Sequence, residues 1–95
     1  MNDVFVALAD PTRRTVLDEL AERSPQTLFE LCQRLALKHR IGSSRQAISQ
    51  HLTVLEEAGL VHSHREGRCK LHRLDTGPLT AIAERWPSTK SEEGP

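Results

Sequence analysis

The stretch from Ser43 to Leu60, SSRQAISQHLTVLEEAGL, carries the pattern that most limits how this chain can fold. It opens on two serines, either of which can cap a helix, and it closes on a glycine and a leucine typical of a helix end. Between these ends, Ile48, Leu52 and Leu55 recur at i, i+4 and i+7 and therefore share one face. The pattern predicts an amphipathic helix that buries this face against the rest of the chain.

The opposite face of its first turns carries hydrogen-bonding side chains and no bulky apolar group. These residues are Ser44, Arg45, Gln46, Ser49 and Gln50. A solvated helix face is one interpretation, but a polar face near a helix N-terminus also suits the major groove of duplex DNA. We expect Arg45 to bind a guanine edge and Gln50 an adenine edge, each contributing about 1–3 kcal/mol of base discrimination.

The roles of two residues on this helix, Gln46 and His51, remain open. If Ser43 is the N-cap, Gln46 occupies the third helical position and can complete a capping box. If Ser44 is the N-cap, Gln46 is free to contact a base. His51 follows the exposed face only in part, so local packing and a phosphate contact fit it equally well.

Charge is concentrated around this helix although the chain as a whole is neutral. The 95 residues contain 13 basic and 13 acidic side chains, which alone would argue against a nucleic-acid partner. Residues 34–73, however, hold eight of the basic residues, three of the acidic ones and all five histidines, a net charge of +5. The flanking segments carry −3 and −2. The positive field therefore lies where a polyanion would need it.

Size and composition indicate one small domain with a thin core. Aromatic residues make up only 3% of the chain, so the core must be aliphatic, and such a domain can gain stability by dimerising. Cys32 and Cys69 do not suggest a disulfide framework, and the sequence has no signal peptide or apolar run of membrane-spanning length. We therefore expect a cytoplasmic protein with reduced thiols and no membrane partner.

Two helices are expected at the start of the chain. The first runs over Asn2–Ala9, and the second from Pro11 to about Arg23 with Asp10 as its N-cap. Arg13 and Arg14, in the first turn of the second helix, are expected to pair with nearby carboxylates rather than to contact DNA.

A third helix follows a loop at residues 24–26. Thr27 and Glu30 form a capping box at its start, and its apolar stripe includes Cys32, which we interpret as a small core residue. Residues 36–42 then form a basic connector. Its two candidates for contact with a DNA backbone are Lys38 and Arg40.

After the central helix the apolar period changes from helical to alternating. Residues 60–74 form two strands joined at Glu66-Gly67, which predicts a β-hairpin. Three cations cluster near its tip: Arg65, Arg68 and Lys70. They either keep an exposed strand edge soluble or bind phosphates and the minor groove, and their place at the tip favours the second interpretation.

A turn at residues 75–78, with Pro78 as the first helical residue, leads into a last helix that stops at Pro87. The polar segment 88–95 is expected to be a disordered tail. The resulting order, α-α-α-α-β-β-α, predicts a mainly α winged helix-turn-helix domain with a small β-hairpin over residues 1–87.

Two apolar surfaces in this arrangement lack cover. They comprise Val4, Phe5 and Leu8 of the first helix and Leu79, Ile82 and Trp86 of the last helix. Trp86 could belong to an intramolecular core, but little of this monomer is left for a final helix to cover. A dimer interface built from both ends of the chain would cover both surfaces.

Four segments stand out in order along the chain: Ala7–Arg14 (ALADPTRR), Arg45–Leu52 (RQAISQHL), Val54–Val61 (VLEEAGLV) and Arg65–Arg68 (REGR). Together they closely resemble the ArsR-type family of bacterial winged-helix transcriptional regulators, over about residues 3–86. The resemblance implies a homodimer built from the first and last helices, with the recognition helix of each subunit in a major groove. Many members of the family repress transcription and release DNA on binding a metal.

Two departures from the family pattern matter. The connector at residues 36–42 is longer than the tight turn usual in the family, which would change the angle of the recognition helix. The thiolate metal site of the founding branch has two cysteines two residues apart on the third helix. Here Arg34 occupies the position two residues after Cys32, where the second cysteine would stand. The last helix has no Asp or His pattern for the alternative site. The chain thus resembles a branch without the known metal ligands, and we expect no metal or other cofactor.

The preferred interpretation is a dimeric transcriptional regulator, a repressor rather than an activator, that binds double-stranded DNA. Two recognition helices about 34 Å apart would require an inverted-repeat operator. The chain has no Gly-rich phosphate loop, no His-Glu-x-x-His motif and no Ser/His/Asp set near an expected cleft, so we do not expect an enzyme.

Two other classes stay open. A metal- or redox-responsive sensor could use the hairpin, because a turn at Glu66-Gly67 would place His64 opposite Cys69 with His62 on the same side, although a fourth ligand is missing. The other class is a winged-helix module that binds proteins and no DNA.

Overall fold

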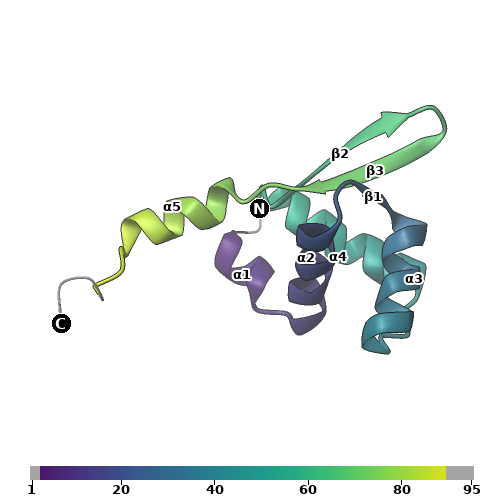
Figure 1. The fold of residues 1–95 in the computed structure, drawn as a ribbon, viewed down its shortest axis with the longest axis horizontal. Helices are drawn as coiled ribbons and strands as arrows, with labels where there is room; N and C mark the ends of the chain where they lie inside the picture. Colours follow the sequence, from purple (N-terminus) through teal and green to yellow (C-terminus); the bar gives the residue numbers. More distant parts are fainter. Residues whose placement is uncertain (1–2, 90–95) are drawn as a thin grey trace.

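The computed structural model describes residues 3–89 and confirms a mainly α winged helix-turn-helix with a small antiparallel sheet (Figure 1). The elements in chain order are α1 (Val4–Leu8), α2 (Pro11–Glu22), β1 (Gln26–Thr27), α3 (Leu28–His39), α4 (Arg45–Glu57), β2 (Val61–Glu66), β3 (Cys69–Leu74) and α5 (Gly77–Arg85). In Figure 1 the β2–β3 hairpin extends over α3 and α4, whereas α5 extends away on the other side of the molecule.

The core is aliphatic and lies where α2, α3 and α4 meet the base of the hairpin. Its buried apolar residues are Ala7, Val16, Leu17, Leu20, Leu31, Leu35, Ile48, Leu52, Leu55, Leu60 and Val61. Helix α4 contributes the three residues that its spacing predicts on one face, and each is at most 2% exposed. Burial of one such side chain stabilises the fold by about 1.5–3 kcal/mol. This face therefore fixes α4 against its neighbours.

Short polar side chains set the helix starts by accepting the first free backbone N–H groups. Asp10 accepts one at 3.0 Å, and Thr27 and Glu30 form the predicted capping box with contacts of 3.1 and 2.9 Å. Helix α1 begins directly after Asp3, whose carboxylate caps it at 2.8 Å. The predicted start at Asn2 lies outside the described residues.

The connector predicted at residues 36–42 is wrong, because α3 continues to His39. The Ala-Leu-Lys run at its start consists of good helix formers. Arg40 then adopts a left-handed φ of 57°, and the N–H of the next residue donates to the carbonyl of Leu35 at 3.0 Å, which closes the helix. Only residues 40–44 separate α3 from α4, so the long connector expected from the sequence is absent.

A serine marks the start of α4, and a glycine marks its end. Ser44, and not Ser43, is the N-cap, since its hydroxyl accepts a backbone N–H at 3.1 Å. Gln46 therefore falls outside the capping-box position and remains exposed. At the other end Gly59 has a φ of 79°, and Leu60 donates back to the last turn at 2.9 Å, as predicted.

Residues 24 and 25 form a loop as predicted, but Gln26, the last residue of the predicted loop, begins strand β1, which pairs with β3. Gln26 lies opposite His72, and its buried amide donates to the carbonyls of Glu19 and Arg23 at 3.1 and 2.7 Å. The side chain thus joins the end of α2 to the sheet. A strand of two residues is too short to produce a periodic signal in the sequence.

The hairpin turn lies one residue later than predicted. Glu66 pairs with Cys69, so Gly67-Arg68 form the two-residue turn. The glycine has a φ of 62°, which the first position of such a turn requires and which glycine adopts without strain. As a consequence His64 faces Leu71 and not the cysteine.

Helix α5 begins at Gly77, one residue before the predicted start at Pro78, and ends at Arg85. The domain limit at residue 87 and the disordered tail at residues 88–95 stay predictions. From residue 90 onward the tail lies outside the described residues.

A buried carboxylate joins α2 to the end of α3. Glu19 is 2% exposed, and His39 and Lys38 lie 2.8 and 3.0 Å from its Oε2, while Arg34 lies 3.6 Å from its Oε1. Burial alone would raise the pKa of Glu19, but hydrogen bonds from His39 and Lys38 outweigh it and hold the pKa below 4.5. This cluster explains why α3 extends further than its apolar stripe indicates.

The two candidate caps of α4 provide a matched pair of substitutions. Ser44→Ala removes the hydrogen bond to the first turn and should lower the free energy of unfolding by about 1 kcal/mol, whereas Ser43→Ala should change it by less than about 0.5 kcal/mol. Chemical denaturation at fixed protein concentration measures both. Equal losses for the two variants would contradict the assignment of Ser44 as the cap.

The Glu19 cluster predicts a pH-dependent stability. Glu19→Gln should lower the free energy of unfolding at pH 7 by about 1.5–3 kcal/mol, and Asp18→Asn, at the exposed neighbouring position, serves as the control. Because the folded-state pKa is depressed, the carboxylate contributes fully above pH 4.5 and its contribution is lost as the pH falls through the folded pKa. The acid limb of the stability curve should therefore be shallower in Glu19→Gln; an unchanged limb would contradict this account.

Candidate nucleic-acid interface

Helix α4 presents a polar surface on the side opposite its buried face. Ser44, Arg45, Gln46, Ser49 and Gln50 are all exposed, as their spacing predicts. None of them supports the core, and the cap at Ser44 leaves the Gln46 amide available. The surface therefore offers a guanidinium, two amides and two hydroxyls in the first two turns of one helix.

The β2–β3 hairpin carries its cations toward the tip. Arg65 and Lys70 are paired across the two strands, and Arg68 lies in the turn itself. All three side chains are exposed. The hairpin is therefore a basic wing, although Glu66 at the tip reduces its net charge.

An open groove of about 370 Å³ joins α4 to this wing. Its lining residues are Thr27, Leu28, Phe29, Arg45, Ser49, Leu52, Arg68, Cys69, Lys70 and His72. The fold thus brings together Arg45 and Ser49 of the helix with Arg68 and Lys70 of the wing. Among the described residues no carboxylate lines this groove, which makes it a place for an anion.

Six of the ten predicted contact residues do not line the groove: Lys38, Arg40, Ser44, Gln46, Gln50 and Arg65. The two glutamines lie on the exposed face of α4 beside it. The predicted contact surface therefore has two parts, the outer face of the helix and the groove that separates this helix from the wing.

The two cations predicted to contact DNA from the connector differ in their surroundings. Lys38 belongs to α3, and its ammonium lies 2.7 Å from Glu22 and 3.0 Å from Glu19. These carboxylates, Glu22 first, raise the pKa of Lys38 and offset its charge. Arg40 is exposed and remains the cation of the short turn between α3 and α4.

Arg13 contacts backbone carbonyls instead of the carboxylates expected from the sequence. It donates to the carbonyls of Ala7 and Val6 at 2.8 and 3.2 Å, and its third nitrogen lies 3.2 Å from Nδ1 of His51. Arg14 likewise donates to a carbonyl of α1 at 2.7 Å. His51 is therefore a packing residue that links α4 to α1 through Arg13, and no sequence pattern indicates this contact.

The hairpin does not assemble the sensor site that a turn at Glu66-Gly67 would produce. His62 lies 2.7 Å from Asp75, and His64 lies 3.7 Å from Glu66. Within residues 3–89 no group of three or more His, Cys, Asp or Glu side chains is placed to hold a metal ion. Cys32 is half-buried, and burial raises the pKa of its thiol.

His72 forms part of the groove wall but has no cation to offer. It is 5% exposed, and burial is the main reason that its pKa falls below 6.5, so it is neutral at pH 7. Its Nδ1 has no hydrogen-bond partner in the described part of the chain, and a carboxylate oxygen of Glu56 lies 3.8 Å from it. The alternation of β3 indicates that this position faces inward, but not that it borders the groove.

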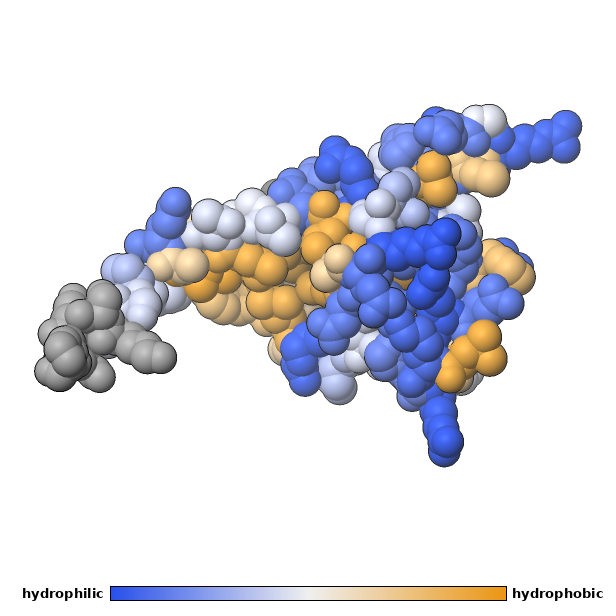
Figure 2. All heavy atoms as spheres, viewed as in Figure 1, coloured by the Kyte–Doolittle hydropathy of each residue, from blue (hydrophilic) through white to orange (hydrophobic). Residues whose placement is uncertain are grey.

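The two ends of the chain share an uncovered apolar surface. Helix α5 has no buried residue, and Phe5 and Trp86 are 54% and 57% exposed. Their rings meet edge to face at 6.3 Å. Figure 2 shows this apolar surface as orange atoms along α5 and α1.

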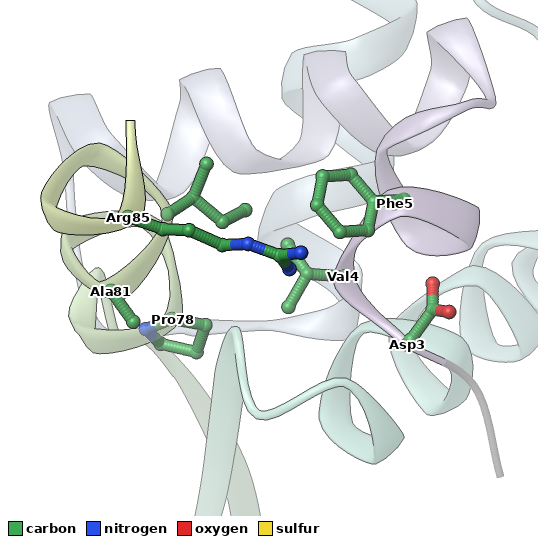
Figure 3. A pocket seen from close by; sticks show the side chains of 7 residues that line it. Asp3, Val4, Phe5, Pro78, Ala81 and Arg85 are labelled. Carbon is green, nitrogen blue, oxygen red and sulfur yellow. The ribbon is translucent and has the colours of Figure 1, made fainter. Parts of the chain in front are cut away.

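A second hollow lies between these two helices. It has a volume of about 350 Å³, and Val4, Phe5, Ala81 and Arg85 are among its lining residues. In Figure 3 the Arg85 side chain extends from α5 toward Val4 and Phe5 of α1. The two helices thus line one hollow on the apolar face of the molecule.

The described part of the chain contains no helix with both the length and the apolar character needed to span a bilayer.

Comparison with known proteins identifies the family. The profile of the helix-turn-helix domain family matches residues 8–64. The chain is 47% identical over 83 residues to the uncharacterized HTH-type transcriptional regulator YuzN of Bacillus subtilis (strain 168), covering 87% of this chain and 90% of that protein. It is 34% identical over 79 residues to the transcriptional repressor SdpR of the same organism, covering 83% of this chain and 80% of that one.

Solved structures agree with this assignment. An ArsR-like transcriptional regulator from Rhodococcus sp. RHA1 superposes with a TM-score of 0.74 at 36% identity, covering 95% of this chain and 78% of that one. The ArsR family transcriptional regulator RHA00566 gives a TM-score of 0.71 at 34% identity, with coverages of 94% and 84%. The chain therefore belongs to the ArsR family of helix-turn-helix transcriptional regulators, which bind DNA and are not enzymes.

Proposed function

We propose that this regulator is a homodimeric repressor that binds an inverted-repeat operator, with α4 of each protomer in the major groove. The observation that carries this proposal is the side-by-side placement of the polar face of α4 and the basic wing, joined by a groove without carboxylates among the described residues. A helix of this kind reads base edges, while flanking cations bind the phosphates.

The residues divide into two roles. Arg45 and Gln50 carry the main base contacts, supported by the remaining polar side chains of the face, Ser44, Gln46 and Ser49. The wing cations Arg65, Arg68 and Lys70, together with Arg40, bind the backbone and set the salt dependence. Lys38 contributes less, because two carboxylates of α2 already neutralise it.

The dimer would form through α1 and α5. Support comes from the half-exposed aromatic residues at both ends of the chain and from an α5 in which no residue is fully buried in the monomer. The paired helices would place two copies of α4 about 34 Å apart, one helical turn of DNA. Repression would follow from occupation of a promoter, and a repressor is among the curated relatives.

The operator hypothesis predicts separate effects for base-reading and backbone residues. After selection of a binding site from a random DNA library, Arg45→Ala and Gln50→Ala should each weaken specific binding by about 1–3 kcal/mol and relax one base position. Lys70→Ala should instead weaken binding to all sequences and reduce the salt slope by about 0.9 for each lost phosphate contact.

Gln33→Ala, an exposed glutamine on the neighbouring helix α3, is the matched control and should bind like the unmodified protein. Circular dichroism checks that each variant is folded. Selection that enriches no DNA motif, or an Arg45→Ala variant with unchanged sequence preference, would refute the proposed recognition face.

The dimer hypothesis predicts a change of mass in solution. Phe5→Ala combined with Trp86→Ala should raise the dimer dissociation constant by at least about tenfold, because the double variant removes two large apolar side chains from the interface. Sedimentation equilibrium measures this constant. Leu37→Ala removes an apolar side chain of α3 that is more exposed than either aromatic residue and should leave the dimer intact; a monomeric unmodified chain would exclude the interface.

A further inference from the structure

Phe29 is an exposed aromatic residue that neither the core nor the ends of the chain explain. It is 60% exposed and is the second residue of α3. Its neighbours Leu28 and Leu31 belong to the apolar stripe that packs inward, so Phe29 lies off that stripe. A single exposed apolar side chain is common on a protein surface, so the groups around Phe29 must decide whether it has a role in binding.

Phe29 forms a wall of the groove between α4 and the wing. Arg45, Arg68 and Lys70 line the same groove, and no carboxylate does so among the described residues. The groove therefore combines three cations with one aromatic ring. A ligand that matches it must alternate anionic groups with apolar carbon–hydrogen surface, as the sugar–phosphate backbone of DNA does.

The glutamines of α4 support a backbone ligand rather than a base in this groove. Gln46 and Gln50 lie outside the groove, on the adjacent exposed face of the helix. If that face of α4 contacts base edges, the DNA strand that carries those bases would continue through the adjacent groove toward the wing. Each phosphate would meet a cation there, and a deoxyribose would meet the ring.

The position of Phe29 is fixed before any ligand binds. Thr27 and Glu30 close a capping box around the first turn of α3, with contacts of 3.1 and 2.9 Å. Thr27 also pairs with Leu71 in the sheet, which joins this turn to the base of the wing. The backbone at Phe29 therefore needs no reordering on contact, and the apolar area of the ring can contribute to binding.

We propose that Phe29 packs on a deoxyribose of the DNA strand that runs between α4 and the wing, as an apolar backbone contact among three phosphate-binding cations. The inference rests on the proposed DNA-binding function and adds to it a contact that is independent of both sequence and salt. It makes Phe29 an affinity residue rather than a specificity residue.

Salt titrations of DNA binding test the proposal. Fluorescence anisotropy would measure binding of the full chain to its selected operator and to an unrelated duplex of equal length, from about 50 to 200 mM salt. Phe29→Ala should weaken binding to both duplexes by about tenfold, as expected when roughly 55 Å² of apolar surface is no longer buried. The slope of log affinity against log salt should not change, whereas Lys70→Ala should reduce it.

Two further variants complete the design. Leu37→Ala, on the same helix and 77% exposed, should bind both duplexes normally, because Leu37 does not line the groove. Phe29→Leu should retain most of the affinity, since it keeps an apolar side chain. The thermal unfolding of the Phe29 and Leu37 variants should be similar to that of the unmodified chain, because neither residue belongs to the core.

Three outcomes would overturn the proposal. Unchanged affinity of Phe29→Ala for both duplexes would show that the ring makes no contact. A loss confined to the operator would assign Phe29 to a base instead. A reduced salt slope would indicate that the substitution displaces a cation. If the unmodified chain binds neither duplex, the DNA-binding function itself fails, and that result is visible before any variant is compared.

Discussion

The burial of one face of α4 determines where the proposed base contacts of this helix lie. Successive residues of a helix are rotated by a fixed angle, so packing Ile48, Leu52 and Leu55 into the core leaves the polar side chains of the first turns facing outward. The cap at Ser44 fixes where the helix begins, and Gly59 fixes where it ends. Because Leu60 and Val61 are buried directly after this end, the hairpin must start from the same core. The wing and the polar face of α4 are therefore two consequences of one packed surface.

The sequence predicts those features of the fold that have a local physical cause. The caps at Asp10 and Thr27 and the left-handed glycine at the end of α4 follow from which side chains can accept an N–H or adopt a positive φ. The two errors differ in their cause. Helix α3 continues to His39 because a carboxylate of α2 holds its last turn, and the hairpin turn shifts by one residue because Gly67 must take the first turn position. The Glu19 contact is not visible in the residues around the end of α3, whereas Gly67 is part of the turn segment itself.

The sequence indicates individual residues of the candidate site, but not that they come together in one groove. Arg45, Ser49, Arg68 and Lys70 are predicted from the exposed positions of one helix and one hairpin, yet the groove that they share depends on the register of β3 against β1. Phe29 and His72 enter the groove for the same reason. Arg13 shows the other limit of such reasoning, because its partners are carbonyls of α1 and a histidine of α4, which no spacing of charged residues indicates.

The neutral net charge of the chain agrees with DNA binding once the positions of the acids are considered. Glu19 and Glu22 bind Lys38, and Glu19 also binds His39, on the side of α3 that faces α2. Asp75 is engaged by His62 and by the N–H of Gly77, which depress its pKa, with the N–H making the larger contribution. These acids take part in contacts within the fold, and among the described residues no carboxylate lines the groove. Since the potential that attracts a polyanion falls off within about 8–10 Å at physiological salt, the local arrangement governs binding. Total charge is therefore a poor criterion for excluding a nucleic-acid partner in a domain of this size.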